Sequence, residues 1–166
     1  MRVLIAYGSK RGGTAGLARM IGDEFARAGF RVDVRRAREV GSIADTDAVV
    51  IAGALYASRW HRDARHFARR YANQLSDRPV WLVSSGPLDG TAAAGELPPV
   101  RQVAAVMDRL GACGQVTFGG RLEADAKGFP ARAMAKKVAG DWRDADHVHR
   151  WVASVVSVLV DQDHAA

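Results

Sequence analysis

The residues from Gly8 to Thr14 combine the groups that bind a phosphate. This stretch, Gly8-Ser-Lys-Arg-Gly-Gly-Thr14, holds three glycines, two hydroxyl side chains and two basic side chains. Glycines let a turn aim several backbone N–H groups at one spot, and the hydroxyl and basic side chains add donors and positive charge. The alternative is a tight turn with no ligand, but the polar side chains inside it favour phosphate binding. The candidate ligands are Ser9, Lys10, Arg11, Gly12, Gly13 and Thr14.

The segments on either side of this turn can position it. Val3–Tyr7 is apolar and predicts a buried strand, and residues 13–28 carry apolar side chains at steps of three and four, which predicts a helix. The first N–H groups of a helix lack partners and lie at the positive end of its dipole. A strand, a glycine-rich turn and a helix in this order therefore predict a phosphate cradle.

Strand and helix patterns alternate along the rest of the chain. We predict strands over 30–34, 47–53, 80–84 and 115–118, and helices over 62–75, 100–110, 130–138 and 144–160. Residues 35–43 are expected to form a short helix or a loop, and 55–61 and 85–99 to form loops. This alternation indicates an α/β fold: one domain, residues 1–166, with a doubly wound five-stranded parallel sheet. Ligands of such sheets bind beyond the carboxyl ends of the strands, where the loops after residues 7, 53, 84 and 118 should meet.

Other phosphate-binding and switch classes fit poorly. A P-loop needs a lysine where Thr14 stands, and the dinucleotide fingerprint needs a glycine spacing that this turn lacks. A phosphoacceptor receiver needs an aspartate at the end of the third strand, where Gly53 stands. The candidate that remains is a ligand with a phosphate monoester and a larger ring system.

The turn resembles the FMN phosphate loop of flavodoxins. The usual pattern there is a hydroxyl residue, any residue, a hydroxyl residue, Gly, any residue and Thr. Ser9, Gly12 and Thr14 match this pattern, whereas Arg11 replaces the second hydroxyl. The resemblance implies FMN as the cofactor and a flavodoxin-like sheet with strand order 2-1-3-4-5.

A closer resemblance is to the flavodoxin-like menaquinone-dependent protoporphyrinogen oxidases, which also carry a basic residue in the phosphate loop. Residues 50–61 resemble their third strand and the following loop, with aromatics and a histidine. Residues 119–122 and 140–144 resemble the same group.

The resemblance implies that the flavin ring lies against the loops after the third and fourth strands. Tyr56 and Trp60 are the aromatics available to stack on it, although either could instead cover the edge of the core. The second loop lacks the tyrosine usual in flavodoxins, so one ring face is open or covered by Leu88, with room for a substrate or quinone. The candidate ring contacts are Leu55, Tyr56, Ala57, Ser58, Trp60, Ser84, Ser85, Gly86, Pro87 and Leu88.

The formal net charge of +6 indicates an anionic ligand, partner or surface. Basic residues concentrate over residues 59–70, either as a solvated face or as a landing site for a carboxylate-bearing substrate, an acidic redox protein or lipid headgroups. Nucleic acid is not expected, because no nucleic-acid-binding motif accompanies the charge. His61 is a candidate catalytic proton shuttle, since the imidazole titrates near neutral pH.

We therefore expect an FMN-dependent oxidoreductase that passes electrons between an organic substrate, such as a porphyrinogen, and a quinone or other acceptor. The alternatives are a small electron carrier with a basic docking face and a flavin-free module that binds another phosphate ligand. The single cysteine excludes an internal disulfide and a cysteine-only metal site, and we predict no metal site. No apolar run is long enough to span a bilayer, so we expect a cytoplasmic protein with at most peripheral contact with membrane quinone.

Overall fold

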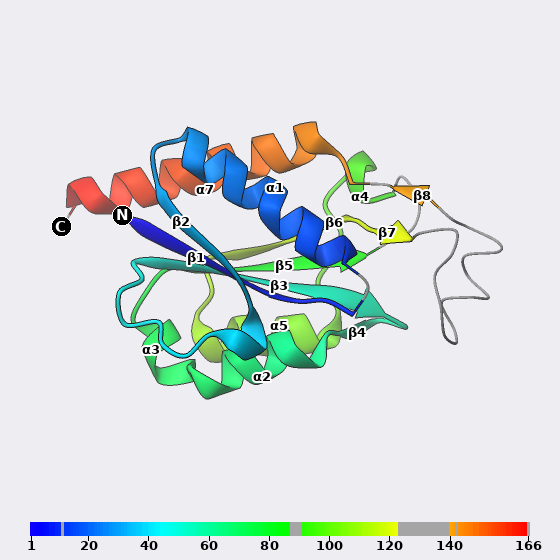
Figure 1. Ribbon diagram of the computed structural model, residues 1–166, viewed down its shortest axis with the longest axis horizontal. Helices are drawn as coiled ribbons and strands as arrows, with labels where there is room; N and C mark the ends of the chain where they lie inside the picture. The colour runs from blue at the N-terminus through cyan, green and yellow to red at the C-terminus, as the bar shows by residue number, and fades with distance from the viewer. Residues whose placement is uncertain (11, 87–90, 123–139, 142, 166) are drawn as a thin grey trace.

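A five-stranded parallel sheet forms the centre of the chain (Figure 1). The computed structural model describes residues 1–10, 12–86, 91–122, 140–141 and 143–165. The parallel strands are β1 (Arg2–Gly8), β2 (Arg31–Arg36), β3 (Ala48–Tyr56), β5 (Val80–Gly86) and β6 (Gly114–Gly119). Their order across the sheet, β2-β1-β3-β5-β6, is the one predicted for five strands.

Helices cover both faces of the sheet (Figure 1). The helices on one face are α1 (Gly13–Arg27) and α7 (Ala145–Ala165), and those on the other are α2 (Arg62–Arg70), α3 (Ala72–Ser76) and α5 (Arg101–Leu110). Alternate residues of each central strand point to opposite faces, so the sheet separates two apolar clusters. The apolar stripe predicted for the first helix is confirmed, since Leu17, Ile21 and Phe25 have no exposed surface.

Some predicted boundaries were wrong. The expected helix over 62–75 is divided between α2 and α3 at Tyr71, whose hydroxyl donates to the carbonyl oxygen of Val40. The expected loop over 55–61 is a β-hairpin, in which β3 continues to Tyr56 and β4 (Arg59–Trp60) returns antiparallel. The last helix extends beyond residue 160, to Ala165.

Several short elements complete the described chain. A 3₁₀ turn, η1 (Ala37–Glu39), lies in the segment expected to be a short helix or a loop, and α4 (Thr91–Ala94) lies in a segment expected to be a loop. Two short strands, β7 (Arg121–Leu122) and β8 (Gly140–Asp141), pair antiparallel as a separate ribbon. The predicted helix over 130–138 lies outside the described residues. Within the described ranges, no helix is both long and apolar enough to cross a membrane.

Candidate functional site

The predicted cradle joins the end of β1 to the start of α1. Gly12 has a left-handed backbone with φ of 81°, and its N–H donates to Ser9 Oγ at 3.1 Å. A Cβ atom added at Gly12 would meet no atom of the described residues within 4 Å, so these residues leave the space beside the turn open. Ser9 is half-buried and Lys10 is exposed. Arg11 lies outside the described residues.

The first turn of α1 is suited to an anion. No side chain caps the helix in the described structure, and its first turn carries no acidic residue. The N–H groups of this turn therefore keep their hydrogen-bonding capacity, and the helix dipole adds positive potential. Thr14, in the same turn, is 2% exposed and adds a hydroxyl. These donors fit a phosphate group.

The β7–β8 ribbon packs directly against the cradle helix. A Cβ at Gly13 would lie 3.2 Å from the carbonyl oxygen of Arg121, and one at Gly16 would overlap Arg143 Nη1. Two hydrogen bonds hold the Arg143 guanidinium to Asp141, from Nε at 2.8 Å and from Nη2 at 2.5 Å. This contact was not predicted from the sequence. Gly16 inside the helical pattern is the signal that could have found it, because such a glycine often marks a close approach.

His61 packs over the end of β1, because Gly8 leaves the room. A Cβ at Gly8 would lie 2.7 Å from His61 Nδ1, which accepts from the backbone N–H of Asp63 at 3.2 Å. Burial lowers the pKa of His61, Asp63 raises it, and the cations Arg62, Lys10 and Arg65 lower it further. His61 is thus a neutral imidazole at pH 7 with its proton on Nε2, and it lies near the cradle lysine.

The prediction that Trp60 contacts the flavin ring was wrong. Its side chain is 1% exposed, and its indole Nε1–H donates to the carbonyl oxygen of Val83 at 3.2 Å. It lies over Gly53, where an added Cβ would come within 2.5 Å of Nε1. Trp60 therefore closes the core at the end of β3 and offers no surface for stacking.

The hairpin carries four further candidates. Leu55 packs over Gly86 of β5, where an added Cβ would lie 2.9 Å from Leu55 Cδ1. Tyr56 is half-buried at the end of β3. The exposed residues Ala57 and Ser58 have φ of 46° and 58°, so they form a two-residue turn with two left-handed positions.

The remaining candidates lie at the end of β5. Ser84 and Ser85 are 2% and 7% exposed and belong to the strand, not to the loop expected from residue 85. Strand register aligns Gly8 with Gly53 and Gly53 with Ser84, which brings the ends of β1, β3 and β5 together as predicted. Pro87 and Leu88 lie outside the described residues.

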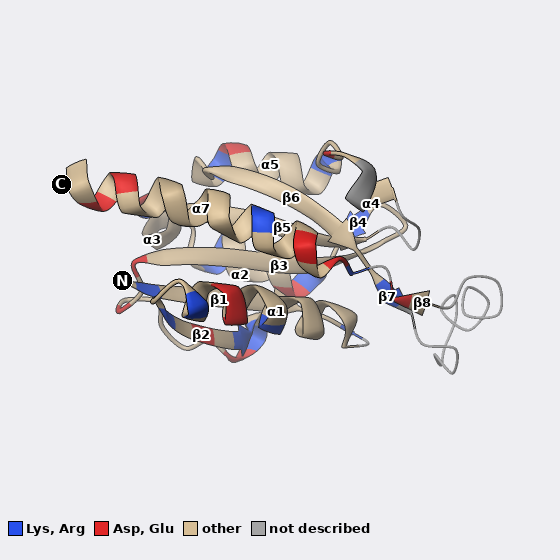
Figure 2. Ribbon diagram, turned by 90° about the horizontal axis from the view of Figure 1, so that it is seen from above, with Lys and Arg blue, Asp and Glu red and all other residues tan. Residues whose placement is uncertain are grey.

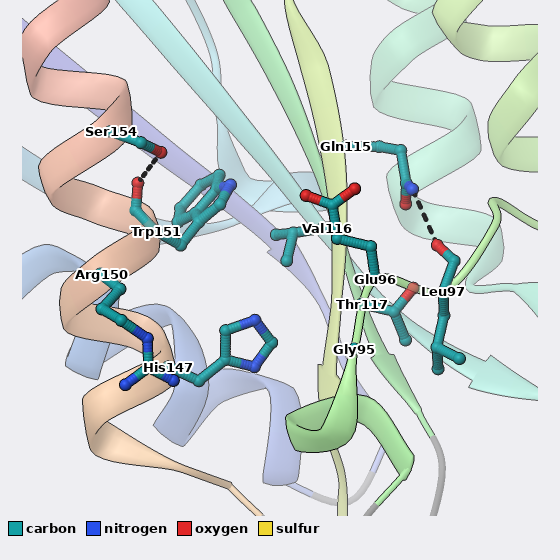
Figure 3. Close-up of a pocket in the computed structure, with 10 residues that line it drawn as sticks. All are labelled: Gly95, Glu96, Leu97, Gln115, Val116, Thr117, His147, Arg150, Trp151 and Ser154. Atoms are coloured by element: carbon teal, nitrogen blue, oxygen red, sulfur yellow. Dashed lines mark hydrogen bonds between the residues drawn. The ribbon is translucent and has the colours of Figure 1, made fainter.

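A separate cavity of about 250 Å³ lies beside the edge strand β6 (Figure 3). Trp151 and His147 extend into it from α7, and Gln115 Nε2 donates to the carbonyl oxygen of Leu97 on its far side. Its lining contains none of the residues predicted to bind a cofactor. In the described ranges, no group of three or more His, Cys, Asp or Glu side chains could hold a metal ion.

A doubly wound parallel sheet with a glycine-rich anion cradle after its first strand defines an α/β domain that binds a phosphate-bearing ligand. The chain belongs to the flavodoxin domain family, whose model matches residues 4–146. FMN, the cofactor implied by the resemblance of the turn, is the cofactor of flavodoxins. No curated protein matches the sequence.

Solved structures support the fold. The oxidised flavodoxin 2 of Bacillus cereus is similar with a TM-score of 0.58 and 16% identity, over 95% of this chain and 99% of that one. A cysteine-to-serine mutant of Pseudomonas aeruginosa flavodoxin gives a TM-score of 0.56 and 14% identity, over 92% and 97%. A mutant flavo di-iron protein from Thermotoga maritima gives a TM-score of 0.63 and 12% identity. The match covers 95% of this chain but only 35% of that protein.

Proposed function

We propose that this chain binds FMN and transfers electrons through it. The observation that supports this most strongly is the start of α1, where uncapped helix N–H groups, open space beside Gly12 and the buried Thr14 occur together. Ser9 and Thr14 would donate hydroxyl hydrogens to the phosphate, the turn would donate backbone N–H groups, and Lys10 would supply charge.

The ring would lie beyond the ends of β3 and β5, against the hairpin. Leu55, Tyr56 and the Ala57–Ser58 turn are the described residues there that support this placement, with Gly86 on the neighbouring strand. Bound FMN would supply one- and two-electron chemistry, while the protein would supply binding, orientation and electrostatics.

The experiment is a visible absorption spectrum of the isolated protein, followed by FMN titration of the apoprotein. We expect a flavin spectrum, or saturable uptake of one FMN per chain. A colourless protein that takes up no FMN would overturn the proposal and favour the flavin-free phosphate-binding alternative.

The second candidate is an enzyme in which the flavin oxidises an organic substrate, such as a porphyrinogen, and passes the electrons to a quinone. His61 favours it, because a neutral imidazole beside the cradle can exchange a proton at Nε2. Anaerobic reduction, followed by addition of a menaquinone analogue or of a redox protein, separates the enzyme from the carrier. Rapid reoxidation by the quinone alone supports the enzyme, and reoxidation only by the protein supports the carrier.

A further inference from the structure

Exposed basic side chains gather at the end of the sheet that carries the proposed FMN site. They are Lys10 after β1, Arg59 in β4, and Arg62 and Arg101, the first residues of α2 and α5. We call this group the basic edge. β4 and the first turns of α2 and α5 lie at the same end of the molecule, opposite the two chain termini (Figures 1 and 2).

Two contacts connect these four positions. The backbone N–H of Trp60 donates to Gln102 Oε1 at 2.9 Å, which holds β4 against the start of α5. Arg59 and Arg101 are the neighbours of those two residues in the chain. On the other side, a Cβ added at Gly8 would lie 3.1 Å from the backbone nitrogen of Ala64, so the end of β1, two residues before Lys10, packs against the first turn of α2.

Among the described residues, little negative charge compensates the basic edge. Arg62 Nε lies 3.5 Å from Asp63 Oδ1, but the Arg62 side chain stays 87% exposed. Across the described parts of the chain, no ion pair neutralises Lys10, Arg59 or Arg101. By contrast, Arg121 and Arg143 on the α1–α7 side share the carboxylate of Asp141. The two ribbon arginines are therefore paired with a carboxylate, whereas the cations of the basic edge keep most of their charge uncompensated by the described residues.

Helix stability does not explain this arrangement. A cation in the first turn of a helix lies at the positive end of the dipole and is unfavourable there. Arg62 and Arg101 both occupy first positions, and the first turn of α5 contains no acidic residue. Charges placed against a local preference are expected where a binding function requires them.

The surroundings of the basic edge favour a protein over the other polyanions. Membrane-surface binding combines basic residues with exposed apolar ones. Among the described residues, the exposed large apolar side chains are Met1, Val158 and Val160, which belong to the chain ends. Binding of single-stranded nucleic acid uses several exposed aromatics for stacking, but Trp60 and Tyr71 are 1% and 6% exposed, and the half-buried Tyr56 is the one other described aromatic beside Arg59.

We propose that the basic edge docks an acidic electron-transfer protein beside the flavin. This inference rests on the proposed function, since the flavin gives such a partner its reason to bind. Opposite charges at the two surfaces would steer the encounter and orient the partner, and salt would weaken the complex.

The test uses a plant-type [2Fe–2S] ferredoxin as the acidic probe and isothermal titration calorimetry on the FMN-loaded chain. The edge variant is Arg62→Glu with Arg101→Glu. The control, Arg31→Glu with Arg109→Glu, makes the same charge change at the start of β2 and the end of α5. Both positions lie at the opposite end of the sheet from the basic edge. At low salt we expect the edge variant to bind the ferredoxin about tenfold more weakly or worse, and the control to stay within about twofold of wild type. No binding by wild type, or equal loss in both variants, overturns the proposal.

Two further measurements complete the test. Stronger edge-dependent binding to phosphatidylserine vesicles or to duplex DNA than to the ferredoxin would overturn it in favour of that polyanion. FMN titration of each variant separates the two proposals, because neither arginine belongs to the cradle. FMN uptake without ferredoxin binding refutes the docking surface alone, whereas ferredoxin binding without FMN uptake supports the surface and refutes the proposed function.

Discussion

Small residues at the ends of the strands create the room in which the site is built. Strand register places Gly8, Gly53, Ser84 and Thr117 in one row across β1, β3, β5 and β6. His61 folds back over the first of these residues and Trp60 over the second. Because these side chains are small, Trp60 of the hairpin can pack onto the core and His61 can lie close to the cradle.

Replacing Gly53 with alanine should destabilise the fold by about 1–3 kcal/mol, because the new methyl group would overlap the buried Trp60 indole and force it to move. Urea denaturation measures the change. Gly114→Ala is the matched control, since it is also in a strand and its Cβ would lie 3.5 Å from the nearest atom, in ordinary contact. Equal losses in the two variants would contradict this explanation.

His61 should make stability depend on pH. Burial lowers its pKa in the folded state, so the unfolded chain binds more protons between that pKa and the ordinary value of about 6.5. The His61 contribution is fully present above about pH 6.5 and is lost as the pH falls through the lowered pKa. His61→Asn keeps an acceptor for the N–H of Asp63 but does not titrate.

We therefore expect urea unfolding of His61→Asn to show a smaller loss of stability on acidification than wild type. The pKa of His147 is also lowered by burial, so part of the pH dependence should remain. An unchanged pH profile in the His61 variant would refute this assignment.

The cradle hydroxyls should contribute directly to FMN affinity. Replacing Ser9 and Thr14 together with alanine removes two donors to a charged group and should weaken FMN binding by about 1–3 kcal/mol. Fluorescence titration measures this loss. Thr46→Ala is the control, because Thr46 lies in the loop before β3, at the opposite end of the strands. Unchanged affinity in the double variant would exclude the hydroxyls as phosphate ligands.

At the scale of elements, the sequence patterns predicted those helices and strands that depend mainly on residues close together in the chain. The apolar run of β3 and the helical spacing of α1 and α5 are visible in the sequence, and the structure contains all three. The hairpin was missed because Ala57-Ser58 lacks the asparagine or glycine that usually marks such a turn. The break at Tyr71 depends on a hydrogen bond to Val40, which is distant in the sequence.

The start of α5 offers a prediction about a whole helix. Arg101→Glu would replace a cation with an anion at the positive end of the helix dipole, which should stabilise the fold by about 0.3–1 kcal/mol. Thermal and urea unfolding at low salt measure the gain, and 1 M salt should remove most of it. Arg101→Gln should give about half the gain. A loss of stability would mean that Arg101 supports the fold, which would remove one argument for a docking role.

At the scale of the whole molecule, the fold could be predicted because its alternation of strands and helices runs through the entire chain. The strand, glycine-rich turn and helix that form the proposed cradle could be predicted because they are contiguous in the sequence. The ring contacts could not be separated from core residues, since Tyr56 and Trp60 carry the same signal in sequence. Only the register of β3 on β4 and the glycine at position 53 assign Trp60 to the core.

The charge of the whole chain should make FMN binding sensitive to salt. The formal charge is +6, and the phosphate would lie at a helix N-terminus beside Lys10, so a dianion should be attracted. Riboflavin has the same ring without the phosphate. Raising the salt from about 0.02 to 0.5 M shortens the screening length several-fold. FMN affinity should therefore fall by about threefold or more, while riboflavin affinity should stay within about twofold. Fluorescence titrations of both ligands, repeated with Lys10→Gln, give the comparison, and the variant should show a weaker salt dependence for FMN. Equal salt dependence for the two ligands would mean that the phosphate is not held by this positive potential, and the cradle would then need another ligand.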